Sequence, residues 1–69
     1  MPKTITSRKL IAILIRNGFV LQRTRGSHHL FQHPLTKRRA LVPLHAKDIP
    51  KGTLHDILKQ SGIAVEEVT

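Results

Sequence analysis

The fold is decided by residues 19–44, FVLQRTRGSHHLFQHPLTKRRALVPL, where three short segments rich in Val, Leu and Phe alternate with turn-forming residues. The segments are FVLQRT, HHLFQH and RRALVPL, and RGS and PLTK connect them. Because these connections are too short to contain a crossover helix, consecutive strands must run antiparallel. We therefore predict a meander of three antiparallel strands over residues 19–24, 28–33 and 38–44.

Helical periodicity precedes this segment. Thr6 or Ser7 is a suitable N-cap, and Asn17-Gly18 supplies a left-handed stop. The predicted helix leaves its basic edge in solvent. Its expected core-facing residues are Leu10, Ile11, Leu14 and Ile15, and its expected solvent-facing residues are Lys9, Ala12 and Arg16.

A second helix is expected after the strands. Asp48-Ile49-Pro50 resembles a helix start, with proline tolerated in the first turn, and Gly62 is the expected end. We expect its apolar stripe to consist of Leu54, Ile57 and Leu58, and Ile63 and Val65 of the following tail to pack back on the core.

The element order defines the fold class. A three-stranded sheet this small must bury one face, and both flanking helices can cover it, which predicts a two-layer α+β fold in α-β-β-β-α order. The other sheet face is then left to solvent or to a partner. A chain of 69 residues has room for one small domain, so we assign residues 1–69 to a single domain.

The charge balance points to a polyanionic partner. Twelve Lys and Arg against four Asp and Glu give a net charge of +8. The basic residues are spread along the chain rather than gathered on one amphipathic helix face, which favours nucleic acid over a membrane surface. The chain has no cysteine, its opening MPKTITSRK lacks the apolar run of a secretion signal, and no apolar run is long enough to span a membrane. We expect a cytoplasmic protein.

Three histidines lie within six residues of RGSHHLFQH. Strand alternation puts His29 and His33 on one face and His28 on the other, so the three rings do not converge on one ion. With no cysteine and few carboxylates to complete a shell, we expect no metal and no other cofactor. For His29, His33 and His55 the ordinary interpretation is a partly exposed polar residue.

His28 follows Gly26-Ser27 at the rim of the sheet, a position that suits chemistry, because rigid backbone holds the ring and glycine lets a substrate approach. RNA carries its own nucleophile, the 2′-hydroxyl, so the enzyme need only move protons. One histidine can act as general base or general acid there, while a nearby Lys or Arg neutralises the developing charge. DNA lacks this hydroxyl, so the scheme selects RNA.

A family resemblance covers nearly the whole chain. The runs GSHHLFQHP, LVPLH and KGTLHDILKQSGI, in this order and spacing, resemble the HicA toxins of bacterial and archaeal toxin-antitoxin pairs. The resemblance implies an mRNA interferase with a fold like the double-stranded RNA-binding domain, and it implies that His28, in Gly-Ser-His, is the catalytic residue. It also implies a HicB antitoxin that covers the site. One departure is His55, where the family usually has Arg or another polar residue.

Residues around His28 divide between function and structure. The resemblance implies a recurring histidine at His45, which either helps to place RNA or ties the loop before the last helix. Ser27 either binds a phosphate or completes the turn, and Gly26 serves backbone geometry at the RNA-binding site. Candidate phosphate contacts are Arg23, Arg25, Lys37, Arg38, Arg39, Lys47 and Lys51, of which Arg25 and Lys47 are favoured because each is close to a named histidine. Gly52-Thr53 either holds a phosphate or caps the last helix.

The leading hypothesis is therefore a metal-independent endoribonuclease toxin that acts on mRNA. The main alternative is a non-catalytic RNA-binding module of the same fold, and a third is a surface that only meets an acidic protein. With only two phenylalanines and no Trp or Tyr, base stacking on aromatic side chains is not expected to be the main mode of RNA capture.

Overall fold

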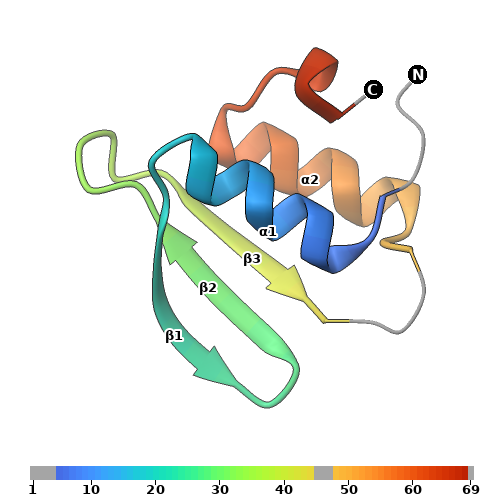
Figure 1. The fold of residues 1–69 in the computed structure, drawn as a ribbon, viewed down its shortest axis with the longest axis horizontal. Coiled ribbons are helices and arrows are strands. Elements are labelled where there is room, and N and C mark those ends of the chain that lie inside the picture. Colours follow the sequence, from blue (N-terminus) through green and yellow to red (C-terminus); the bar gives the residue numbers. More distant parts are fainter. Residues whose placement is uncertain (1–4, 45–47, 69) are drawn as a thin grey trace.

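The computed structural model describes residues 5–44 and 48–68 and has the predicted α-β-β-β-α order (Figure 1). The three strands form one antiparallel sheet in the order β1-β2-β3, and both helices lie on the same face of it. The predicted α+β class and meander are confirmed. The elements are α1 (Ser7–Arg16), β1 (Val20–Arg25), β2 (His28–Gln32), β3 (Arg39–Pro43), α2 (Lys51–Ser61) and a short 3-10 helix, η1 (Val65–Val68).

Helix α1 begins and ends where the sequence indicates. The Thr6 hydroxyl accepts a hydrogen bond from the backbone N–H of Lys9 at 3.1 Å, and Asn17 is the C-cap. The buried face of α1 is rotated about the helix axis relative to the predicted one: Ile13 is buried, whereas Ile15 is 59% exposed. The prediction for Ile15 was wrong, since the sheet lies beneath the other flank of the helix.

Helix α2 starts later than its sequence suggests. Pro50 is the N-cap, with extended backbone and no side-chain capping bond, so Asp48 and Ile49 precede the helix. The predicted stop is confirmed, because Gly62 adopts a left-handed conformation with φ 77°. The stripe of Leu54, Ile57 and Leu58 is buried as expected.

The tail after Gly62 folds back over the helices (Figure 1). Ile63 is buried, as predicted, but Val65 is 37% exposed and Val68 takes the inward position. The prediction for Val65 was wrong because η1 turns the chain with a 3-10 period, which brings the last residue of this short helix onto the core.

The core lies between the helices and the inner face of β2 and β3. Phe31, Ala40 and Val42 supply the sheet side of it, and each is at most 2% exposed. Strand β1 is different, because all six of its residues are exposed. It therefore extends the sheet beyond the area that the helices cover. Within the part of the chain that the structure describes, no helix is long and apolar enough to cross a membrane.

Candidate functional site on the open sheet face

The face of the sheet away from the helices carries residues in straight rows across the strands. Arg25 of β1 pairs with His28 of β2, which pairs in turn with Pro43 of β3. The next row is formed in the same way by Arg23, Leu30 and Leu41. Side chains two residues apart share a face of a strand, so both rows point away from the helices.

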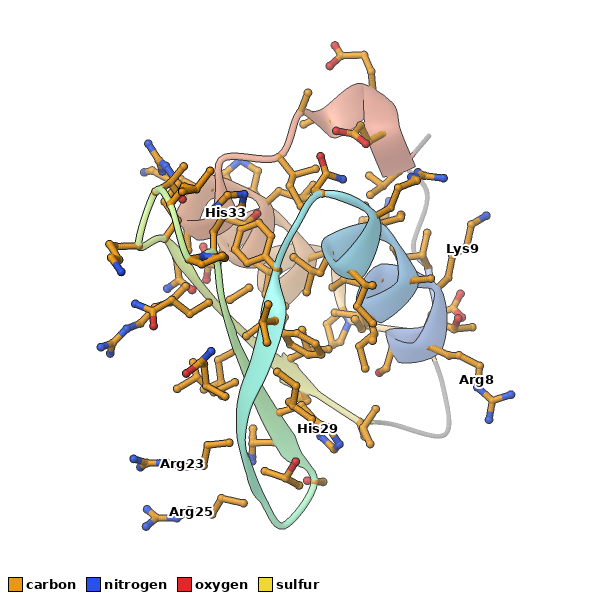
Figure 2. The ribbon with its side chains drawn as sticks, turned by 60° about the vertical axis from the view of Figure 1, so that its left-hand side comes forward. Arg8, Lys9, Arg23, Arg25, His29 and His33 are labelled. Carbon is orange, nitrogen blue, oxygen red and sulfur yellow. The ribbon has the colours of Figure 1, made fainter. Side chains whose placement is uncertain are left out.

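A β-bulge sets the register of β1. The pairing shifts between Leu21 and Arg23, so one extra residue, Gln22, lies opposite the partner strand. The bulge puts Leu21 on the helix side, opposite Phe31, and keeps Arg23 and Arg25 together on the open side. Figure 2 shows both arginines pointing away from the helices.

The turn that presents His28 is held from two sides. Gly26 has φ 58° and Ser27 does not share a positive φ, the pattern of a two-residue type II′ turn with glycine first. A Cβ at Gly26 would meet nothing within 4 Å, so glycine is needed here for its conformation rather than for space. The carbonyl of Ser27 accepts a hydrogen bond from the N–H of Leu44 at 2.6 Å, which joins the turn to the end of β3.

A second contact fixes the far end of the same row. The hydroxyl of Ser7, a buried residue at the start of α1, donates to the carbonyl of Pro43 at 2.7 Å. Because Pro43 is the cross-strand neighbour of His28, the helix layer holds the strand beside the candidate catalytic ring.

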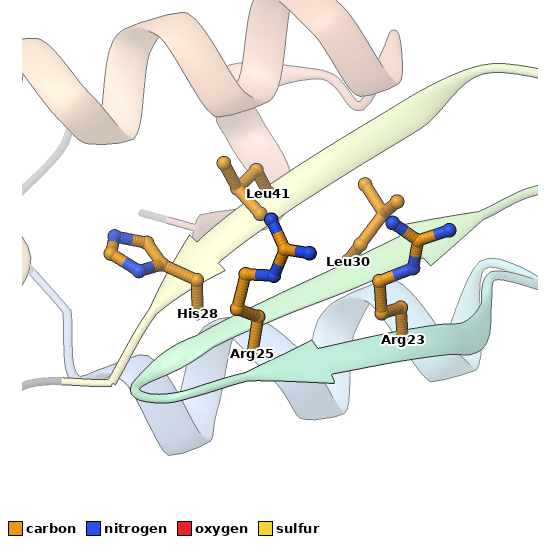
Figure 3. Close-up of a pocket in the computed structure, with 5 residues that line it drawn as sticks. All are labelled: Arg23, Arg25, His28, Leu30 and Leu41. Carbon is orange, nitrogen blue, oxygen red and sulfur yellow. The ribbon is translucent and has the colours of Figure 1, made fainter.

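A shallow pocket of about 340 Å³ lies over these two rows (Figure 3). Leu30 and Leu41 form its apolar floor, and the other lining residues are Arg23, Arg25 and His28. The two arginines and His28 are exposed, and Leu41 is 47% exposed. The pocket therefore combines an apolar floor, two positively charged guanidinium groups and an imidazole.

The charge distribution along the chain favours anions at this face. All four acidic residues lie after residue 47, and they are Asp48, Asp56, Glu66 and Glu67. The strands and the turns between them therefore contain basic residues and no acidic residue. Such a surface raises the local concentration of a polyanion.

His33 has a structural role. Its ring packs edge-on against Phe19, and its Nδ1 accepts hydrogen bonds from the N–H groups of Leu35 and Thr36 at 3.1 and 3.3 Å. These two N–H groups therefore occupy the Nδ1 lone pair. His33 closes the β2–β3 turn and is half-buried, and its Nδ1 binds the turn backbone rather than a substrate.

The other histidines occupy separate places. His29 lies on the helix side of β2 (Figure 2), half-buried, and its Nδ1 is buried with no hydrogen-bond partner among the described residues. His55 is exposed on α2, as expected, and so is Lys59 on the same helix edge. The predicted accessory residue His45 falls in the segment 45–47, outside the described residues, as does Lys47.

Not every predicted phosphate contact reaches this face. Lys51 is the first residue of α2, in the helical layer, and does not line the pocket. Arg38 lies over the C-terminal end of α2, where its Nη1 donates to the carbonyl of Gln60 at 3.4 Å and its side chain would meet a Cβ at Gly62. This position complements the negative end of the helix dipole.

Sequence reasoning missed the floor of the pocket. It gave no role to Leu30 or Leu41 and less weight to Arg23 than to Arg25. The signal was present, since Phe31 and Val42 are obvious core residues and alternation sends their neighbours outward. Among residues 5–44 and 48–68, no three His, Asp or Glu side chains are grouped so that they could hold a metal ion.

The fold and this face together define a small two-layer α+β domain with an open, cationic sheet surface. Comparison with protein families then identifies the chain, because the model for the HicA toxin of bacterial toxin-antitoxin systems matches residues 7–63. The chain belongs to this family, and it is the toxin of a toxin-antitoxin pair whose other member is an antitoxin. A comparison with curated proteins finds no match.

Proposed function

We propose that this toxin is an endoribonuclease that cleaves mRNA, with His28 moving protons and Arg25 neutralising the phosphate. The observation that carries the proposal is the direct pairing of Arg25 with His28 across the two-residue turn on the open face. Membership of the HicA family supports it, since the resemblance implies an mRNA interferase.

The reaction needs no nucleophile from the protein. The 2′-oxygen bonds to the adjacent phosphorus, and the bond from phosphorus to the 5′-oxygen breaks. The 2′-hydroxyl proton passes to a base and the 5′-oxygen receives one from an acid, which leaves a cyclic 2′,3′-phosphate and a free 5′-hydroxyl. His28 serves as one of these groups, and water or His45 is the candidate for the other. Arg25 lowers the cost of the extra negative charge on the phosphorane.

A pair of histidine variants tests the proposal. His28→Ala should reduce cleavage of a single-stranded RNA by about 100-fold or more, while RNA binding is kept. His55→Ala is the matched control, because it removes another exposed imidazole, on α2, and cleavage by this variant should be unchanged. Mapping of the RNA ends should give cyclic phosphates, and a DNA strand of the same sequence should stay intact.

The same experiment discriminates against the rival function. If wild-type protein, free of contaminating ribonuclease, binds RNA but leaves it intact, the chain is a non-catalytic RNA-binding module. If His28→Ala cuts as fast as the wild type, the assignment of His28 is wrong.

We also propose that the antitoxin is a HicB-like protein that covers the open face with carboxylates. The cluster of Arg23, Arg25 and His28, without nearby acidic residues of the chain itself, supports a complementary acidic partner. Arg25→Glu should then weaken the complex, whereas Lys59→Glu on α2 should not. Equal weakening by both would show that the antitoxin covers a different face.

A further inference from the structure

We propose that the pocket beside His28 holds one unpaired nucleobase, so that the substrate is engaged as a single strand. The inference rests on the proposed ribonuclease function and adds the substrate class. It is carried by the composition of the pocket, which is apolar below and cationic at the side.

The floor is formed by two adjacent leucines on the solvent-facing side of the sheet. Leu30 and Leu41 are direct cross-strand neighbours on the solvent-facing side of the sheet, where antiparallel sheets commonly carry polar residues. These two side chains are not part of the hydrophobic core, which lies on the other side of the sheet, so their exposed surface does not contribute to core packing. A flat apolar surface of this kind fits the face of a heterocyclic ring.

The arginines place the rest of the nucleotide. Arg23 is the cross-strand neighbour of Leu30, and Arg25 is that of His28. The row that contains the leucines therefore lies one step, of two residues along each strand, from the row that contains His28. That step is about 6.6–6.8 Å, a separation that a single nucleotide can span. A base on the leucines therefore puts its own sugar and phosphate near His28, and the guanidinium groups can pair with the phosphate or stack on the ring.

Only an unpaired base can use this floor. In an RNA duplex the face of each base is covered by its stacked neighbours, and the major groove is too narrow for side chains to read. Phe19 and Phe31 offer no alternative platform, because they are 4% and 2% exposed. The leucine floor makes no hydrogen bonds, so selection among the four bases should be weak.

The test measures binding in the His28→Ala background, where the RNA is not consumed. The probes are a single-stranded oligonucleotide, the same strand annealed to its complement, and a strand of equal length with abasic ribonucleotides. Leu41→Ser should weaken binding of the ordinary strand about tenfold with no change in its dependence on salt, because no charge is removed. Leu35→Ser is the matched control, since Leu35 is 85% exposed and outside the pocket.

Leu41→Phe guards against an effect of folding, because an enlarged floor should tighten binding of the ordinary strand. The abasic strand should bind the His28→Ala protein about as weakly as the ordinary strand binds the protein that also carries Leu41→Ser. Equal affinity for ordinary and abasic strands, or for single strand and duplex, would overturn the pocket assignment while leaving cleavage by His28 intact. Cleavage that persists in His28→Ala would instead contradict the proposed ribonuclease mechanism, regardless of the binding results for the Leu41 variants.

Discussion

The ring of His33 stands nearly perpendicular to that of Phe19, with the ring centroids 5.3 Å apart. His33 directly follows the last residue of β2, whereas His28 is the first residue of that strand and its side chain points to the opposite face of the sheet. One histidine stabilises the turn and the other faces the solvent. Their different surroundings predict different consequences of mutation.

His33→Ala should destabilise the protein. It removes the edge-on aromatic contact and two hydrogen-bond acceptor interactions with the turn backbone, which together are worth about 1.5–3 kcal/mol. Urea unfolding should show this loss, while His55→Ala should stay within about 0.5 kcal/mol of the wild type. A small effect of His33→Ala would mean that the turn holds its shape without the ring.

Gly18 makes the position of His33 possible. Gly18 has φ 91°, and a Cβ there would lie 2.8 Å from Nε2 of His33. Gly18→Ala should therefore cost about 1–3 kcal/mol in unfolding free energy. The control is Gly52→Ala on α2, where a Cβ meets nothing and the helix should gain at most about 1 kcal/mol.

A double variant separates the two causes of that cost. If the steric clash with the ring dominates, Gly18→Ala should cost much less in a His33→Ala background than in the wild type. If the backbone conformation alone dominates, the two free-energy changes should add.

Arg38 and Arg25 should differ in what they support. Arg38→Gln should lower stability by about 0.3–1 kcal/mol, because the side chain interacts with the C-terminal end of α2. Arg25→Gln should leave unfolding nearly unchanged but weaken RNA binding and reduce the slope of log affinity against log salt by about 1. Filter binding over a salt series gives the RNA affinity and its salt dependence, and urea unfolding gives the stability. The opposite result would place the RNA over α2.

His29 carries a buried nitrogen without a partner among the described residues. Such a group costs free energy that an apolar side chain of similar size does not. His29→Leu should therefore keep or raise the unfolding free energy, by up to about 1 kcal/mol. A large loss of stability would show that the nitrogen is satisfied in solution.

Much of this architecture follows from local patterns. Turn residues between short apolar segments predicted the meander, and caps at Thr6 and Gly62 predicted where helices begin and end. Alternation along β2 was enough to place His28 and His29 on opposite faces. These features are local because they depend on backbone geometry within a few residues.

Contacts between distant segments needed the tertiary structure. The exposure of Ile15, the support of Pro43 by Ser7, and the use of Arg38 at the end of α2 each depend on how the layers pack. The sequence of β1 resembles that of the other strands, yet β1 lies beyond the area that the helices cover. Its bulge aligns Arg23 and Arg25 with the row of pocket residues on β2. Sequence by itself therefore determined the order of elements and the face of His28. Only the packing of layers decided which side chains surround it, because neighbours across a sheet are set by register and not by proximity along the chain.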